Sequence, residues 1–377
     1  MARPLKPVFS REEINQLLKP MTAAVTHAVT ATGSTQLRTR EADDLQALYL
    51  YEPFILALAQ AAEPPSCAYS PDPYRSDSVC VQPSAALREL GGAWNWMDKA
   101  LKDGSRQQQI LRHLHPRLMA FHQAYASLMH LYGSHVTGSY QALPAPRADE
   151  FAQRYSEAFT TFQQQVRSPA LAAEVNRLQK RSRRHAEGQR AYIDALLEQG
   201  PLVVTYLQLG YVAVQEWQRP LQSLKQDLHR LLHTHPGRAL RNEALLGFIW
   251  KLADGIERGY YSHLLLFHRA DCAPDETALL GALQQCWIHD ITQGAGACYR
   301  MTCSLRGRQN LLAHTRIDSR DAPDYRTLCD FIEYLNRLDQ LYRLEAPKGT
   351  SIYGRSHLPG SQAGRSRRTS HDTLSHE

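Results

Sequence analysis

The stretch that decides the fold reads Gly200-Pro201-Leu202-Val203-Val204-Thr205-Tyr206-Leu207. The six residues after the Gly-Pro turn signal are apolar, β-branched or aromatic, a pattern typical of a short buried strand rather than a helix. Two further extended segments, residues 245–252 and 260–267, flank a Gly-containing loop at 254–259 that suits a hairpin. These three segments predict a sheet after residue 200.

Helical patterns alternate with these strands. Apolar residues recur at helical spacing in residues 217–233, 275–292 and 323–344, whereas residues 297–303 and 311–317 read as short strands. This order of elements predicts an α+β domain over residues 190–355, built as a mostly antiparallel sheet covered by helices.

The chain before this domain has a different pattern of apolar residues. Helical spacing recurs in residues 12–60, where a Thr/Ala/Gly-rich stretch near residues 30–35 interrupts it, and in residues 87–132 and 149–191. This pattern predicts a mainly helical N-terminal region, residues 1–180, of unknown function. Residues 63–83 carry five prolines and predict a loop. Residues 356–377 are rich in Gly, Ser and Arg and predict a disordered basic tail.

Composition limits the class of protein. The 377 residues are 43% hydrophobic and include 43 Lys and Arg against 37 Asp and Glu, a net charge of +6. This composition favours a folded core and excludes wholesale disorder. Because the chain has no apolar run of about 18 residues and no signal peptide, we expect a cytoplasmic protein without membrane association. The seven cysteines show no paired spacing, so we expect reduced thiols.

The densest basic run lies in residues 177–190. Only one acidic residue, Glu187, interrupts it, and two interpretations are open: a solvated helix face, or contact with the phosphates of nucleic acid. Its cationic members are Arg177, Lys180, Arg181, Arg183, Arg184 and Arg190.

Two further segments place polar side chains beside apolar ones. On the strand 260–267, alternation puts Tyr261 and His263 on one face. On the last helix, Tyr334 and Arg337 lie three residues apart and flank the apolar stripe. Taken alone, the strand is more simply interpreted as carrying a structural histidine, and the helix as carrying a tyrosine at the edge of the core.

Several motifs together resemble one family, the gene-II-type replication proteins of inoviruses (filamentous phages), also met as the YagK/YfjJ C-terminal domain in integrated elements. The resemblance covers residues 190–355. The residues that carry it are Gly247-Phe248-Ile249-Trp250-Lys251-Leu252, Gly259-Tyr260, His263-Leu264-Leu265-Leu266-Phe267 and Tyr334-Leu335-Asn336-Arg337-Leu338-Asp339-Gln340.

The resemblance implies a replication initiator of the HUH endonuclease kind, which nicks and rejoins single-stranded DNA at an origin for rolling-circle replication. Tyr334 would attack the phosphodiester, Arg337 would steady the phosphate, and His263 with Asp254 would hold a divalent metal, Mg²⁺ or Mn²⁺. Single-stranded or phage origin DNA would be the partner, and host replication proteins are possible further partners. Nucleic-acid contacts would come from the basic run and from Lys251 and Arg258, with aromatic stacking by Trp250, Tyr260 and Tyr261.

The chain departs from the family pattern at the metal site. Tyr261 stands where the family has its first histidine, and Ala253 where it has a carboxylate. Asp254 comes one position later and faces the other way unless a bulge re-aims it. One imidazole is too few for a metal unless Asp254, Glu257 or His314 joins it.

Two functions are therefore open for such a domain. The first is a metal-dependent nickase in which Arg337 replaces the family's lysine. The second is a catalytically degenerate descendant that binds DNA or a replication partner. If the family match is false, a helical interaction protein is left.

Overall fold

The fold was analysed in a computed structural model of the chain. It describes residues 7–8, 26–30, 33–37, 41–64, 67–72, 74–83, 93–94, 114–136, 142–212, 220–234, 243–255, 259–301, 304–305, 308–309, 314–341, 344, 346 and 350–358.

The expected α+β architecture and its antiparallel sheet are confirmed. Eight strands form the sheet, and every ladder in it is antiparallel. Their order is β13 (Tyr353–Arg355), β7 (Leu245–Gly255), β8 (Gly259–Arg269), β6 (Leu202–Tyr211), β9 (Gly296–Met301), β1 (Thr26–Thr30) and β2 (Gly33–Leu37), while β12 (Thr315–Ile317) pairs with the start of β6.

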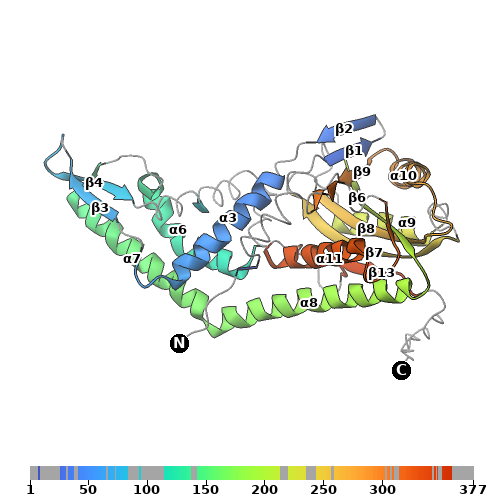
Figure 1. The fold of residues 1–377 in the computed structure, drawn as a ribbon. Coiled ribbons are helices and arrows are strands. Elements are labelled where there is room, and N and C mark those ends of the chain that lie inside the picture. Colours follow the sequence, from blue (N-terminus) through green and yellow to red (C-terminus); the bar gives the residue numbers. More distant parts are fainter. Residues whose placement is uncertain are drawn as a thin grey trace, which may run out of the picture.

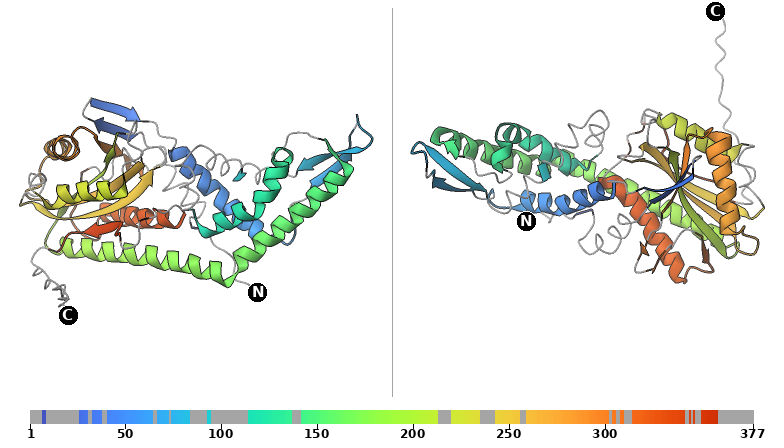
Figure 2. Two further views of the ribbon diagram at one scale, coloured as in Figure 1. Left: turned by 180° about the vertical axis from the view of Figure 1, so that it is seen from behind. Right: turned by 90° about the horizontal axis from the view of Figure 1, so that it is seen from above.

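Helices cover both faces of this sheet (Figures 1 and 2). On one face, Val204 and Tyr206 share a core with α8 (Pro169–Leu197) and α11 (Pro323–Leu341). On the other, Leu207 and Leu209 pack with α9 (Leu221–His233), α10 (Glu276–Gln284) and the π-helical turn η3 (Gln285–Ile291). This alternation along β6 explains why its residues are buried throughout.

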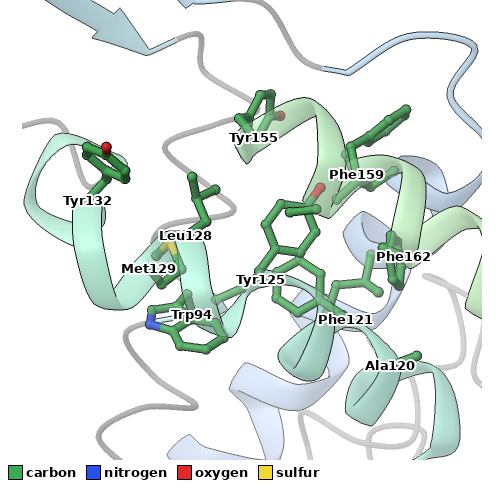
Figure 3. Packing of buried hydrophobic residues seen from close by; sticks show 14 of the residues in the cluster. Trp94, Ala120, Phe121, Tyr125, Leu128, Met129, Tyr132, Tyr155, Phe159 and Phe162 are labelled. Carbon is green, nitrogen blue, oxygen red and sulfur yellow. The ribbon is translucent and has the colours of Figure 1, made fainter. Parts of the chain in front are cut away.

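A second lobe is built from residues before 170. Its core lies among α3 (Glu41–Gln60), α6 (Pro116–Val136) and α7 (Ala145–Arg167), and aromatic rings dominate it (Figure 3). The rings of Phe121 and Phe162 meet edge to face with centroids 5.7 Å apart. A three-stranded sheet flanks the helices, formed by β3 (Cys67–Pro71), β4 (Ser78–Pro83) and β5 (Ala142–Pro144), and a short hairpin of β10 (Ser304–Leu305) and β11 (Arg308–Gln309) lies elsewhere in the chain.

The helix α8 joins the two lobes (Figures 1 and 2). Ser168 caps its start by accepting a hydrogen bond from the Leu171 amide at 3.3 Å, and the helix then continues for 29 residues. The boundary expected between residues 180 and 190 is therefore wrong, because it falls inside this helix.

Two expectations for the N-terminal region are also wrong. Residues 26–37 lie in the stretch that was expected to be helical on both sides of an interruption near residues 30–35, but they form β1 and β2, because β1 finds a partner strand in β9. Residues 63–83, expected to be a loop, contain the hairpin of β3 and β4. Pro71 and Pro83 end these strands, where a missing amide hydrogen costs little.

Among the described residues, the free cysteines are Cys80, Cys272, Cys286, Cys298 and Cys329. In the same part of the chain, no helix is both long enough and apolar enough to cross a membrane. The tail predicted to be disordered starts at residue 356, but its first residues are ordered. The hydroxyls of Ser356 and Tyr192 share a hydrogen bond of 2.5 Å. The tail after residue 358 lies outside the described residues.

Gly247 gives a direct test of the packing between α8 and the sheet. A Cβ there would overlap the Tyr192 hydroxyl and lie 2.8 Å from Ser356 Oγ, whereas one at Gly281, in α10, meets nothing within 4 Å. We expect Gly247→Ala to lower the free energy of unfolding by about 1–3 kcal/mol. Gly281→Ala, the control, should raise it by up to about 1 kcal/mol because alanine favours a helix. Urea unfolding measures both, and equal effects would contradict the packing described.

Candidate functional site

The sheet face beneath α11 carries a row of polar side chains. His263 on β8 pairs with Gln208 on β6 and with Lys251 on β7, so the three positions lie side by side. The Tyr206 hydroxyl lies 2.7 Å from His263 Nδ1 and accepts a hydrogen bond from Gln208 Nε2 at 2.8 Å. The Tyr206 hydroxyl therefore links the His263 ring to the Gln208 amide.

Tyr334 lies on the same face as His263. The rings form a series of contacts in which His263 meets Tyr206, Tyr206 meets Phe331 at 4.7 Å, and Phe331 meets Tyr334 at 6.5 Å between centroids. Tyr334 is only 5% exposed. The fold thus brings the sequence-predicted tyrosine and histidine into one cluster, with Phe331 and Tyr206 between them.

Lys251 has a different environment from the one expected. Its ammonium is buried, forms an ion pair with Asp339 at 2.7 Å and donates a hydrogen bond to the Leu335 carbonyl. Burial raises the pKa of Asp339, and the nearby charge of Lys251 opposes that shift. Lys251, expected to contact nucleic acid, is instead an internal cation that ties β7 to α11.

Of the expected metal ligands, His314 lies away from His263. β7 pairs regularly with β8 from Lys251 to Gly255, and the backbone of Asp254 pairs with that of Tyr260, three residues along β7 from the Lys251–His263 pair. His314 Nδ1 lies 3.0 Å from Thr205 Oγ1, and Thr205 alternates with Tyr206 along β6, so that contact belongs to the opposite face. The side chain of Asp254 and all of Glu257 and Arg258 lie outside the described residues.

The donor set that is described does not fit a divalent metal. Among the described residues, no group of three or more His, Cys, Asp or Glu is close enough to hold an ion. His263 has one nitrogen committed to Tyr206, and its cross-strand neighbour is the cation of Lys251. A Mg²⁺ or Mn²⁺ ion prefers several oxygen ligands and is repelled by a fixed ammonium group.

Arg337 lies at the junction of the two lobes. Its side chain is 20% exposed and lies 3.8 Å from Glu333 on the same helix. Its guanidinium also donates to the backbone carbonyl of Val8, in the N-terminal segment. Arg337 therefore sits one turn from Tyr334 as expected, but its hydrogen bonds go to the protein.

The basic run forms an exposed face of α8. Arg177, Arg181 and Arg184 follow one another at helical spacing with Lys180 beside them, opposite the buried Leu178 and Ser182. Within the described residues, no ion pair or hydrogen bond occupies Lys180, Arg181 or Arg184. Arg177 and Arg183, by contrast, pair with Glu174 at 3.7 Å and Glu187 at 2.7 Å, and Arg190 pairs with Glu333 at 2.6 Å. We call Lys180, Arg181 and Arg184 the α8 basic face.

Sequence reasoning missed Tyr206, Gln208 and Asp339. A signal for the first two was present, because an aromatic hydroxyl and an amide two residues apart interrupt an otherwise apolar strand. The sequence carries no such signal for the pairing of Asp339 with Lys251, because that contact depends on how α11 is rotated about its own axis against the sheet.

None of the known protein-family models, curated proteins or solved structures matches this chain. The likeness to phage replication proteins therefore rests on the quoted motif residues alone.

Removing the internal cation tests the buried ion pair. Lys251→Met leaves the Asp339 carboxylate buried without its partner, so we expect the free energy of unfolding to fall by about 3–5 kcal/mol. The double variant Lys251→Met with Asp339→Asn removes both charges and should recover at least part of this loss. Denaturant unfolding of wild type, both single variants and the double variant completes the cycle. Strict additivity would show that the two side chains do not interact.

Proposed function

We propose that the chain is a replication-initiator-like protein that binds single-stranded DNA through the α8 basic face and does not use a divalent metal at His263. The observation that carries this proposal is the set of exposed cations, Lys180, Arg181 and Arg184, that form no ion pair with a carboxylate within the described residues. Exposed cations at helical spacing suit the regular charge of a phosphate backbone, and they need no base-specific contact.

The polar row under α11 supports the non-catalytic form of this function. The hydrogen bond between His263 and Tyr206 links β8 to β6, and the ion pair between Lys251 and Asp339 holds β7 to α11. These structural contacts explain why His263 and Lys251 occupy their positions without assigning either residue a catalytic role. The domain then acts by binding DNA, with phage origin DNA and host replication proteins as the partners to test.

Salt dependence of binding tests the α8 basic face. We expect the double variant Arg181→Ala/Arg184→Ala to weaken binding to labelled single-stranded DNA. The magnitude of the log–log salt slope should fall by about 1.4, because each phosphate that is no longer neutralised lowers it by about 0.7. The matched control is Arg177→Ala/Arg183→Ala, which removes the same charge from the same helix at residues that already have carboxylate partners. It should change the slope less, as measured by fluorescence anisotropy at several salt concentrations. Equal changes of the salt slope in the two variants would show that DNA responds to the overall charge of the helix and that the α8 basic face is not a specific binding surface.

Nicking is the second candidate function, favoured by the contacts that link Tyr334 through Phe331 and Tyr206 to His263. A tyrosine nucleophile would become covalently linked to a 5′ or 3′ phosphate of the cleaved strand.

An adduct assay separates the two candidates. The chain is incubated with labelled single-stranded origin-like DNA and Mn²⁺ or Mg²⁺, beside Tyr334→Phe, which removes one hydroxyl. We expect no adduct from either protein and equal DNA affinity. An adduct that forms with wild type and disappears in Tyr334→Phe would establish the nickase and refute the non-catalytic proposal.

A further inference from the structure

Val8 occupies an unusual position between the two lobes. Its amide donates to both carboxylate oxygens of Glu52, at 3.0 and 3.1 Å, and Glu52 belongs to α3 of the N-terminal lobe. Its carbonyl accepts from Arg337, on α11 of the other lobe. One residue of the N-terminal segment is therefore bound through both of its backbone polar groups, from opposite sides.

The side chain of Val8 is bound as well. It is 6% exposed and belongs to the same apolar cluster as Tyr334 and Leu335 on α11. Hydrogen bonds to the backbone, combined with a pocket for a side chain, are also what proteins use to bind an extended peptide segment.

Glu52 is a costly residue to bury without such a ligand. It is 2% exposed, and burial raises its pKa to about 7, against the opposing effects of the Val8 amide, Arg117 and Arg337. Arg117, on α6, is also buried, and its own pKa is lowered by burial. A buried carboxylate persists only when hydrogen-bond donors and cations surround it, and the Val8 amide is one of those donors.

We propose that Glu52 and Arg337 form a socket for Val8, and that Val8, bound there, latches the two lobes together and engages the Arg337 guanidinium. The latch does not depend on the nucleic-acid function. While the segment is bound, the Arg337 guanidinium is engaged by a carbonyl and is withheld from any other anion. Release of the segment exposes Arg337 and the buried Glu52 together.

The latch can open without separating the lobes. α8 is continuous between them, and the His115 amide donates independently to the Leu341 carbonyl at 2.8 Å. Variants of the latch should therefore keep both cores folded.

Amide hydrogen exchange of the full-length chain at pH 8 tests the socket, with mass spectrometry of the peptide that contains Val8. We expect protection of that amide in wild type and in the control Val8→Ile, which keeps an apolar side chain. Glu52→Gln removes the charge at nearly constant shape, and Val8→Asp places a carboxylate in the apolar cluster. Both should speed exchange of this peptide at least tenfold while peptides from β6 and β8 stay protected.

Three outcomes would overturn the proposal. They are an unprotected Val8 amide in wild type, wild-type protection in Glu52→Gln, and protection that increases with protein concentration, which would assign the segment to a second copy of the chain. If Val8→Asp also loses protection in β6, the milder Glu52→Gln decides the result. The nucleic-acid proposal is measured separately through the α8 basic face, so either can fail alone.

Discussion

The packing of α11 between the sheet and α8 is the constraint on which the other features depend. Asn336 fixes its rotation, because its carbonyl accepts from Ser182 Oγ at 2.8 Å and its side-chain amide donates to Gln189 at 2.7 Å. With that face turned toward α8, Phe331 and Tyr334 must point to the sheet core, and Arg337 must point to the lobe junction. A rotation of one residue step, about 100°, would break all of these contacts at once.

Charges around α11 are held in pairs. Lys251 and Asp339 form an ion pair under α11, and Arg190 and Glu333 form a partly exposed one at the contact with α8. The cations of the α8 basic face are exposed and have no such partner among the described residues. Burial raises the pKa of Asp339, and Arg181 lies near enough to this cluster for its charge to oppose that shift, so the proposed binding surface and the buried ion pair are electrostatically coupled.

Sequence reasoning found the parts of the fold that depend on local apolar patterns. The strands around Val204, Ile249 and Leu265 were predicted because apolar runs of that length form buried strands with little regard to context. β1 was not predicted, because its residues become a strand only through pairing with β9, far along the chain. The same distinction holds at the site: alternation placed Tyr261 and His263 on one face, whereas the Lys251–Asp339 and Val8–Glu52 contacts depend on how separate elements meet.

The contacts of the N-terminal segment have a consequence for folding during synthesis. Val8 and Arg337 are 329 residues apart, and β1 near residue 28 pairs with β9 near residue 299. During synthesis, β9 and α11 therefore emerge long after the N-terminal lobe has left the ribosome. Until then Val8 lacks its Arg337 partner and β1 presents an unpaired edge, the kind of surface that chaperones bind and that promotes aggregation. Premature termination before β9 would leave that edge permanently unpaired.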